Sequence, residues 1–124
     1  MSTRPVLKPF QVITDGSMAG SLTSDVTIID NKSIVGYDIS WSGTSPIGTM
    51  SVEVSNSYSQ NADGSVRNSG NWTTLTLTST PSVSGNTGHG FIDLDITSAY
   101  AIRLVYTRVS GVGTMQAYVT AKVT

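Results

Sequence analysis

Two stretches of this chain carry nearly the same phrase: WSGTSPIGTMSVEVS at residues 41–55 and RVSGVGTMQAYVTA at residues 108–121. In each copy an alternating apolar segment is followed by Ser-Gly, a short loop, Gly-Thr-Met and a second alternating segment. Glycine permits the sharp reversal that joins two antiparallel strands, so each copy predicts a β-hairpin. Met50 and Met115 then open the return strands with inward side chains. Because the two short loops differ in length and composition, the repeat indicates a repeated element of the fold rather than a repeated binding site.

Apolar and polar residues alternate with a period of two along most of the chain. This pattern predicts β-strands with one buried and one exposed face, and no segment shows the helical period. Antiparallel strands joined by glycine-rich turns favour a two-sheet β-sandwich of jelly-roll type, with an up-and-down barrel as the alternative. About eight strands are expected, at residues 10–14, 21–29, 34–41, 49–58, 72–79, 90–96, 101–109 and 114–123.

The length of 124 residues fits a single domain, which we place at residues 10–124. The preceding residues 1–9 contain two prolines and two basic residues, and proline is unsuited to the interior of a sheet. We therefore expect residues 1–9 to form an extended N-terminal arm, with a floppy terminus as the alternative. The arm residues expected to contact a neighbouring subunit or a capsid are Arg4, Pro5, Lys8 and Pro9.

Charge is scarce in this sequence: Asp, Glu, Lys and Arg make up 12% of the residues, and the formal net charge is −1. Without a basic patch, the chain is not expected to bind nucleic acid. The absence of cysteine excludes disulfides and thiolate metal sites. No apolar run is long enough for a membrane span, and the first residues lack the apolar core of a secretion signal, so we expect synthesis in the cytoplasm. Weakly charged strand faces, rich in Ser and Thr, favour association with other subunits.

Two connections are longer than a hairpin requires, and loops of such length often bind a ligand or a partner. Residues 58–71 are mostly polar, and residues 79–90 contain one proline and three glycines. A tyrosine at the mouth of the first loop can stack on a sugar ring while polar neighbours form hydrogen bonds with its hydroxyls. The side chains assigned to this ligand-binding hypothesis are Tyr58, Asn61, Asp63, Arg67 and His89.

No arrangement typical of an enzyme is present in the sequence. His89 is the only histidine, and the Gly-x-Ser-x-Gly turn of a serine hydrolase is missing. Asp93 and Asp95 share one strand face, where they are expected to pair with Arg103 or Arg108 rather than to bind a metal. The segment NADGS lacks the glutamate that completes a calcium loop. We therefore expect a non-enzymatic protein without a metal or cofactor.

Three phrases resemble small phage-encoded β-sandwich proteins of virus particles, of the capsid-decoration or head-fibre type. They are WSGTSPIGTMSVEVSN at residues 41–56, NWTTLTL at residues 71–77 and YAIRLVYTRVSGVGTM at residues 100–115. A strand that ends in Ser-Asn, a loop that leads to Trp72 and a late Arg-Leu-x-Tyr strand are also similar to discoidin-like, galactose-binding-like sandwiches. The loop after Asn56 is longer than in the discoidin pattern, so no ligand site carries over from it.

The resemblance implies a non-enzymatic structural protein of a bacteriophage virion, made in the host cytoplasm. It implies partners of two kinds: other copies of the chain, with a homotrimer favoured, and other virion proteins. Binding to the particle is then expected through the arm and one end of the sandwich. The alternative is a carbohydrate-binding or adhesin module that recognises host-surface glycans through the loops at residues 58–71 and 79–90. Neither interpretation requires a cofactor, nucleic acid or membrane insertion.

Overall fold

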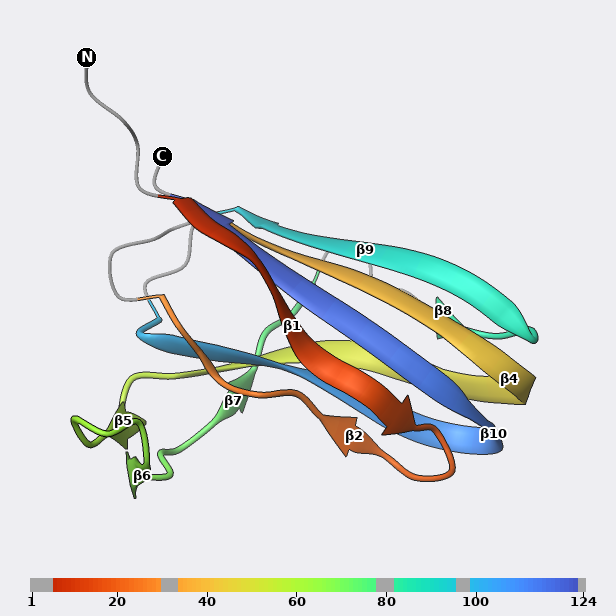
Figure 1. Cartoon of the computed structure of the whole chain (residues 1–124), viewed down its shortest axis with the longest axis horizontal. Helices are drawn as coiled ribbons and strands as arrows, with labels where there is room; N and C mark the ends of the chain where they lie inside the picture. Colours follow the sequence, from red (N-terminus) through yellow and green to blue (C-terminus); the bar gives the residue numbers. More distant parts are fainter. Residues whose placement is uncertain (1–5, 30–33, 78–81, 96–98, 123–124) are drawn as a thin grey trace, which may run out of the picture.

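The computed structural model describes residues 6–29, 34–77, 82–95 and 99–122 of the chain. The regular structure of these residues consists of β-strands (Figure 1), and every pair of strands is antiparallel. This confirms the all-β, antiparallel fold class. Within the described ranges, no helix is long and apolar enough to cross a membrane. The strands are β1 Val6–Ser17, β2 Leu22–Thr23, β3 Thr27–Ile28, β4 Ile34–Ser55, β5 Ser59–Gln60, β6 Val66–Asn68, β7 Thr73–Thr74, β8 Ser82–Val83, β9 Thr87–Asp95 and β10 Ala101–Lys122.

The two longest strands, β4 and β10, form the frame of the molecule. They pair along their entire length, from Ile34 opposite Lys122 to Ser55 opposite Ala101. Figure 1 shows that this two-stranded ribbon doubles back on itself, so that its two halves face each other. Side chains that point inward from both halves can therefore meet in one core.

Three names describe this ribbon below. The corner is the reversal, made of residues 43–47 of β4 and residues 109–113 of β10. The first limb is the half that contains the beginning of β4 and the end of β10. The second limb is the half that contains the end of β4 and the beginning of β10.

The repeated phrase lies at the corner, but the two hairpins expected there are not formed. Instead, the two copies pair with each other across the ribbon. Trp41 lies opposite Met115, and Met50 lies opposite Tyr106, which gives the pair of copies approximate two-fold symmetry. The prediction of a hairpin in each copy is therefore wrong, whereas the inward direction of Met50 and Met115 is confirmed because both side chains are fully buried.

The corner bends because its pairing is irregular. The register between β4 and β10 shifts twice, on either side of Ser110. Ser45 and Gly111 adopt positive φ angles of 47° and 79°, which ordinary strand residues avoid. Extra residues of this kind bulge one strand, increase its twist and turn the ribbon. Glycines that would permit a hairpin also permit such a bulged bend, so the local sequence does not distinguish the two.

Shorter strands widen each limb. In the first limb, β1 pairs with β10 and β9 pairs with β4. In the second limb, β2 and β3 pair with β10, while β7 and β8 pair with β4. Hydrogen-bonded pairing continues from one limb to the other, so the main sheet is a single eight-stranded sheet where two separate sheets were expected. The second sheet is the small hairpin β5–β6.

The first strand begins earlier than expected. β1 starts at Val6, so Lys8 and Pro9, which were expected in an arm, belong to a strand that pairs with β10 of the same chain. The register shifts between Leu7 and Phe10, where Pro9 has no N–H to donate. An edge strand tolerates such a proline because β1 pairs with β10 alone among the described strands. Arg4 and Pro5 lie outside the described residues.

The core lies between the two limbs and follows the alternation of the sequence. The first limb contributes Val35, Tyr37, Ile39 and Trp41 from β4, all of which are buried. Burying one such large apolar side chain stabilises the fold by about 1.5–3 kcal/mol. The second limb and the end of β10 contribute further buried residues, namely Met50, Val52, Ile102, Leu104, Tyr106, Met115, Ala117, Val119 and Ala121.

Two polar atoms on the inner face of β4 have no hydrogen-bond partner among the described residues. They are the hydroxyl of Tyr37 and the indole Nε1 of Trp41. Burial disfavours the ionised phenolate and so raises the pKa of Tyr37 well above its usual value. The Trp41 ring lies directly over Gly88 of β9, where a Cβ atom would overlap the indole. These aromatic side chains fill the space between the limbs at the cost of two unsatisfied polar groups.

Candidate functional site

The side chains of the loop hypothesis do not form one site. Tyr58 is only 6% exposed, so its ring is not the open stacking platform that was expected. The ring packs against Trp72 with 5.8 Å between centroids, and its hydroxyl accepts a hydrogen bond of 2.9 Å from Gln60 Nε2. The expectation of an accessible Tyr58 is therefore wrong, because a loop residue distant in sequence covers the ring.

Asn61, Asp63 and Arg67 are exposed on the β5–β6 hairpin. Asp63 Oδ1 accepts hydrogen bonds from the hydroxyl and the backbone N–H of Ser65, at 2.6 Å and 3.0 Å. These hydrogen bonds lower the pKa of Asp63, the side-chain bond contributing most. The carboxylate thus closes an Asx turn in which Gly64 has a φ of 89°.

His89 lies far from this hairpin. It belongs to strand β9 rather than to a loop, and Figure 1 places β9 and the β5–β6 hairpin in different parts of the molecule. Its Nε2 atom contacts Oδ1 of Asp38 on the neighbouring strand β4. The structure therefore brings Asn61 and Asp63 together but separates both from His89.

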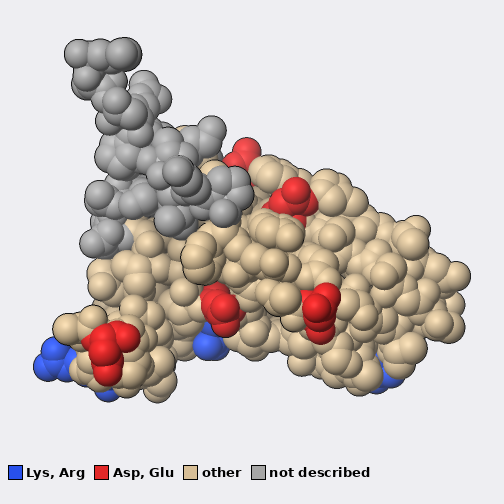
Figure 2. Space-filling model, in the orientation of Figure 1, with Lys and Arg blue, Asp and Glu red and all other residues tan. Residues whose placement is uncertain are grey.

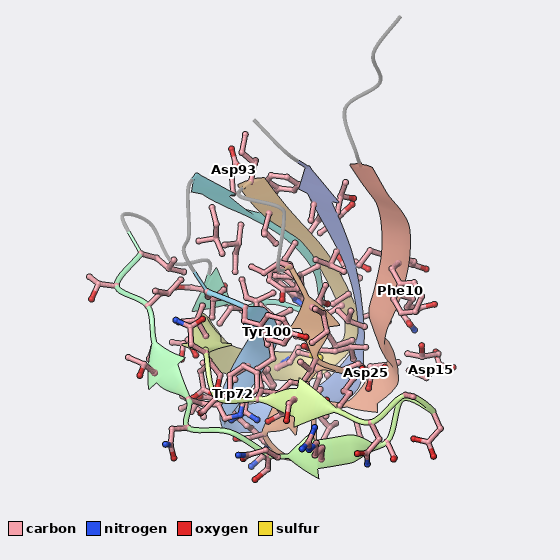
Figure 3. The ribbon with its side chains drawn as sticks, turned by 90° about the vertical axis from the view of Figure 1, so that its left-hand side faces the viewer. Phe10, Asp15, Asp25, Trp72, Asp93 and Tyr100 are labelled. Carbon is pink, nitrogen blue, oxygen red and sulfur yellow. The ribbon has the colours of Figure 1, made fainter. Side chains whose placement is uncertain are left out.

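A third group of side chains covers the outside of the second limb. The Arg103 guanidinium lies over the Trp72 ring, 4.1 Å from its centroid, and binds Glu53 at 2.7 Å. Arg103 thus pairs with Glu53 rather than with Asp93 or Asp95, and Arg108 donates to the Gly111 carbonyl oxygen at 2.9 Å. Figure 3 shows Trp72 beside the strands of the β5–β6 hairpin and away from Phe10 and Asp93. These contacts hold the hairpin against the sheet. The charged groups of Arg103 and Glu53 are already paired with each other.

The outside of the first limb carries a different combination, which we call the aromatic face. Its members lie in two neighbouring cross-strand rows. Tyr118, Asp38 and Phe91 pair across β10, β4 and β9, and the next row contains Gln116, Ser40 and His89. Phe91 and Tyr118 are 59% and 42% exposed. Phe10 on the edge strand β1 is also 59% exposed (Figure 3), but it pairs with the core-facing Val119 and so does not belong to this face. The Phe91 ring extends over Gly36, where a Cβ atom would come within 2.9 Å of it.

A shallow hollow of about 220 Å³ lies on the same limb, at the next cross-strand rows toward the corner. Neither Tyr118 nor Phe91 lines it, and the Phe91 ring lies over Gly36, on the side away from the hollow. Ser40 and Gln116 are paired across β4 and β10, and Ser42 and Thr114 form the adjacent pair. All four side chains are uncharged and can both donate and accept hydrogen bonds. The residues that line the hollow are Ser40, Trp41, Ser42, Thr114 and Gln116.

Gln116 is held in place at one side of the hollow. Its Oε1 atom accepts hydrogen bonds from Gln11 Nε2 at 2.7 Å and from the Asp15 backbone N–H at 3.0 Å. Its Nε2 atom donates to Asp15 Oδ1 at 2.5 Å. Asp15 reaches this position through a positive φ of 48° at an irregular part of β1. The amide is therefore preorganised, while the His89–Asp38 contact lies within the aromatic face, where Asp38 stands between Tyr118 and Phe91.

Ser40, His89 and Asp38 are the residue types of a hydrolase triad, but their arrangement differs from one. A triad requires the serine hydroxyl to hydrogen-bond to the histidine ring. Here Asp38 occupies the His89 Nε2 atom, and no hydrogen bond joins Ser40 to His89 in the described part of the chain. The described residues also contain no group of three or more His, Cys, Asp or Glu that could hold a metal ion.

The sequence indicated some of these residues but not the face. The alternation places Asp93 and Tyr118 on exposed strand faces, and an exposed tyrosine such as Tyr118 is able to stack on a sugar. The pairing of β10, β4 and β9 brings Tyr118 and Phe91 into one row. Only the register places them together. The register between strands that are distant in the chain cannot be predicted from the alternation alone.

No known family model matches this sequence, and no curated protein matches it. Among solved structures, the fold is shared with a chain in the structure of infectious bursal disease virus, Gx strain. That likeness has a TM-score of 0.53 at 9% identity and covers 98% of this chain but 32% of the viral chain. The crystal structure of the SPBc2 prophage-derived protein YomS also aligns, with a TM-score of 0.48 at 13% identity over 97% of this chain and 96% of that one. The chain thus spans about a third of the viral chain, and the likeness establishes a common β architecture.

Proposed function

We propose that this protein is a non-enzymatic structural component of a bacteriophage virion, of the capsid-decoration or head-fibre type. The observation that carries the proposal is a group of exposed aliphatic side chains at the corner, where Arg108 is the neighbouring charged residue. Ile47, Val109 and Val112 are 44%, 66% and 47% exposed, and all three belong to the corner. In Figure 2 acidic side chains are scattered singly over the visible face, and the end on the right is almost free of charge. Clustered exposed aliphatic side chains are typical of a surface that another protein covers.

The architecture supports the same proposal. In the first limb the strand order is β1, β10, β4, β9, and in the second limb β10 and β4 again lie between the flanking strands. Two facing four-strand layers with this alternation are consistent with the jelly roll, a fold that recurs in viral capsids. The likeness to a chain of a virus structure agrees with a virion location.

We further propose that the protein assembles as a homo-oligomer, with a trimer favoured, and also binds other virion proteins. The low total charge supports this because few charged side chains oppose contact between copies. The corner is the end proposed to contact the particle or a neighbouring copy. The arm residues Arg4 and Pro5 are proposed as a second contact. Synthesis in the host cytoplasm follows from a virion role.

The experiment is to purify phage particles from the strain that encodes the chain and to measure the protein in them. We expect a fixed number of copies per particle and, for the isolated protein, a trimer mass in solution. Val109→Asp should abolish particle binding while leaving the circular dichroism spectrum unchanged. Val66→Asp is the matched control because Val66 is 56% exposed on β6, away from the corner. Absence of the protein from washed particles would refute the virion role.

A further inference from the structure

We propose that the aromatic face of the first limb is a binding site for a neutral oligosaccharide. This site differs from the loop site suggested by the sequence, since neither the β5–β6 hairpin nor Tyr58 belongs to it. The proposal rests on the composition and geometry of the face alone. It therefore stands independently of the virion role, although a surface glycan is a natural target for a particle.

The first requirement of such a site is a set of open aromatic rings. Sugar rings bind to aromatic side chains because their C–H faces are apolar while their edges carry hydroxyls. Tyr118 and Phe91 lie in one row on strands separated by β4, which places their backbones about two strand spacings, or roughly 10 Å, apart. The Phe91 ring reaches over Gly36 of β4, so both rings are exposed on the same face.

The second requirement is a set of hydrogen-bonding groups on the same limb as the rings. The hollow supplies the hydroxyls of Ser40, Ser42 and Thr114 and the amide of Gln116. A fixed amide loses less entropy when a ligand binds, and Gln116 is fixed by Gln11 and Asp15. A few polar groups placed beside apolar contact surface are what orient a small ligand in its site.

The negative charge of the aromatic face favours a neutral glycan over an acidic one. Asp38 and Asp93 are exposed on this face, and Asp15 borders it. The arginines whose side chains are described, Arg67, Arg103 and Arg108, lie on β6 or on the second-limb part of β10. The described face thus offers carboxylates that accept hydrogen bonds from hydroxyls but repel phosphate or carboxylate groups.

The same charges argue against a second copy of the chain as the occupant. A two-fold contact through this face would bring Asp38 and Asp93 of one copy close to the same residues of the other. Like charges placed opposite each other across an interface are unfavourable. The corner, which carries no described acidic side chain, is better suited to contact between copies.

The test uses isothermal titration calorimetry of the full chain against neutral oligomers of glucose, galactose, mannose and N-acetylglucosamine. Oligogalacturonate serves as the acidic comparison. We expect at least one neutral oligomer to bind and oligogalacturonate not to bind. Tyr118→Ala and Phe91→Ala should each weaken binding about tenfold, the effect of losing one aromatic stacking contact. Phe91→Tyr keeps the ring and should retain binding.

Tyr100→Ala is the matched control. Tyr100 is 37% exposed and lies directly before the second-limb part of β10, so its loss should leave glycan affinity unchanged. Binding to no neutral oligomer would overturn the proposal, as would affinity that survives Tyr118→Ala or a preference for oligogalacturonate. Dissociation of an oligomer by Phe91→Ala without any glycan binding would assign the face to a second copy instead. None of these outcomes depends on whether the protein is found in phage particles.

Discussion

At the scale of single residues, the clearest irregularity is the hydroxyl of Tyr37. It is buried in the core without a hydrogen-bond partner among the described residues. A buried polar group of this kind destabilises the fold, because it gives up its contacts with water and gains none in return. The Tyr106 hydroxyl differs, since it donates to the Ile47 carbonyl oxygen at 3.3 Å. The two tyrosines therefore form a natural comparison.

We predict that Tyr37→Phe leaves the free energy of unfolding unchanged or raises it by about 1 kcal/mol. Tyr106→Phe should instead lower it by about 1 kcal/mol, because it removes the donor to Ile47. Urea denaturation of both variants and of the wild type measures these differences. A clear loss of stability in Tyr37→Phe would mean that the hydroxyl has a partner, for instance a buried water molecule.

Which side chains face the core is largely predictable from this sequence. The inward set of β4, from Val35 to Trp41, follows directly from the period-two alternation, as does the inward set at the end of β10. The environments of Tyr58 and Trp72 are not predictable in this way. Trp72 lies half-buried against Arg103, and its ring packs on Tyr58. Contacts of this kind join loops and strands that no local pattern relates.

At the scale of elements, the corner depends on a few residues with unusual backbone geometry. Gly111 has a φ of 79°, and a Cβ atom there would overlap the carbonyl group of Ser45 on the opposite strand. Gly64, in the β5–β6 hairpin, has a similar φ of 89°, but a Cβ atom there would have open space for 4 Å around it. The two glycines share a conformation and differ only in their surroundings.

We predict that Gly111→Ala lowers the free energy of unfolding by more than Gly64→Ala. Gly64→Ala should cost about 1 kcal/mol, the strain of a positive φ. Gly111→Ala adds a steric conflict with the backbone of β4 and should cost about 3 kcal/mol. Thermal and urea denaturation of the two variants provide the comparison. Equal losses would show that the corner relaxes around the added methyl group.

The elements themselves were easier to predict than their partners. Six of the expected strand ranges fall within or overlap β1, β4, β9 and β10, but the chain continues through the corner without the predicted hairpins. Alternation specifies which face of a strand is buried, whereas the identity of the neighbouring strand depends on contacts across most of the chain. For the same reason the expected arm is too long, since the pairing of Val6 with Lys122 cannot be predicted from the sequence around either residue.

At the scale of the whole molecule, the fold is dominated by pairing between distant segments. Ile34 pairs with Lys122, and β1 pairs with the same end of β10. Long segments of chain must therefore be ordered before these contacts form. Their conformational entropy is lost before the stabilising contacts are made.

We predict slow folding for a domain of this size, on the millisecond-to-second scale typical of all-β proteins with non-local contacts. Stopped-flow refolding monitored by tryptophan fluorescence measures the rate, because Trp41 becomes buried in the core. Removal of residues 101–124 should abolish folding, since β1, β2 and β3 would lose the strand with which they pair and β4 would lose its longest pairing. Refolding within microseconds would contradict this account.

The pairing of the two phrases at the corner has a consequence for how this protein changes over generations. Gly43 and Gly113 lie opposite each other so closely that a Cβ atom on Gly43 would overlap Gly113. Each glycine already presents the smallest possible group to the other, so a side chain added at one position cannot be compensated at the other. Aligned descendants of this gene should therefore keep glycine at both positions. Duplication of a hairpin would instead leave both copies free to diverge separately.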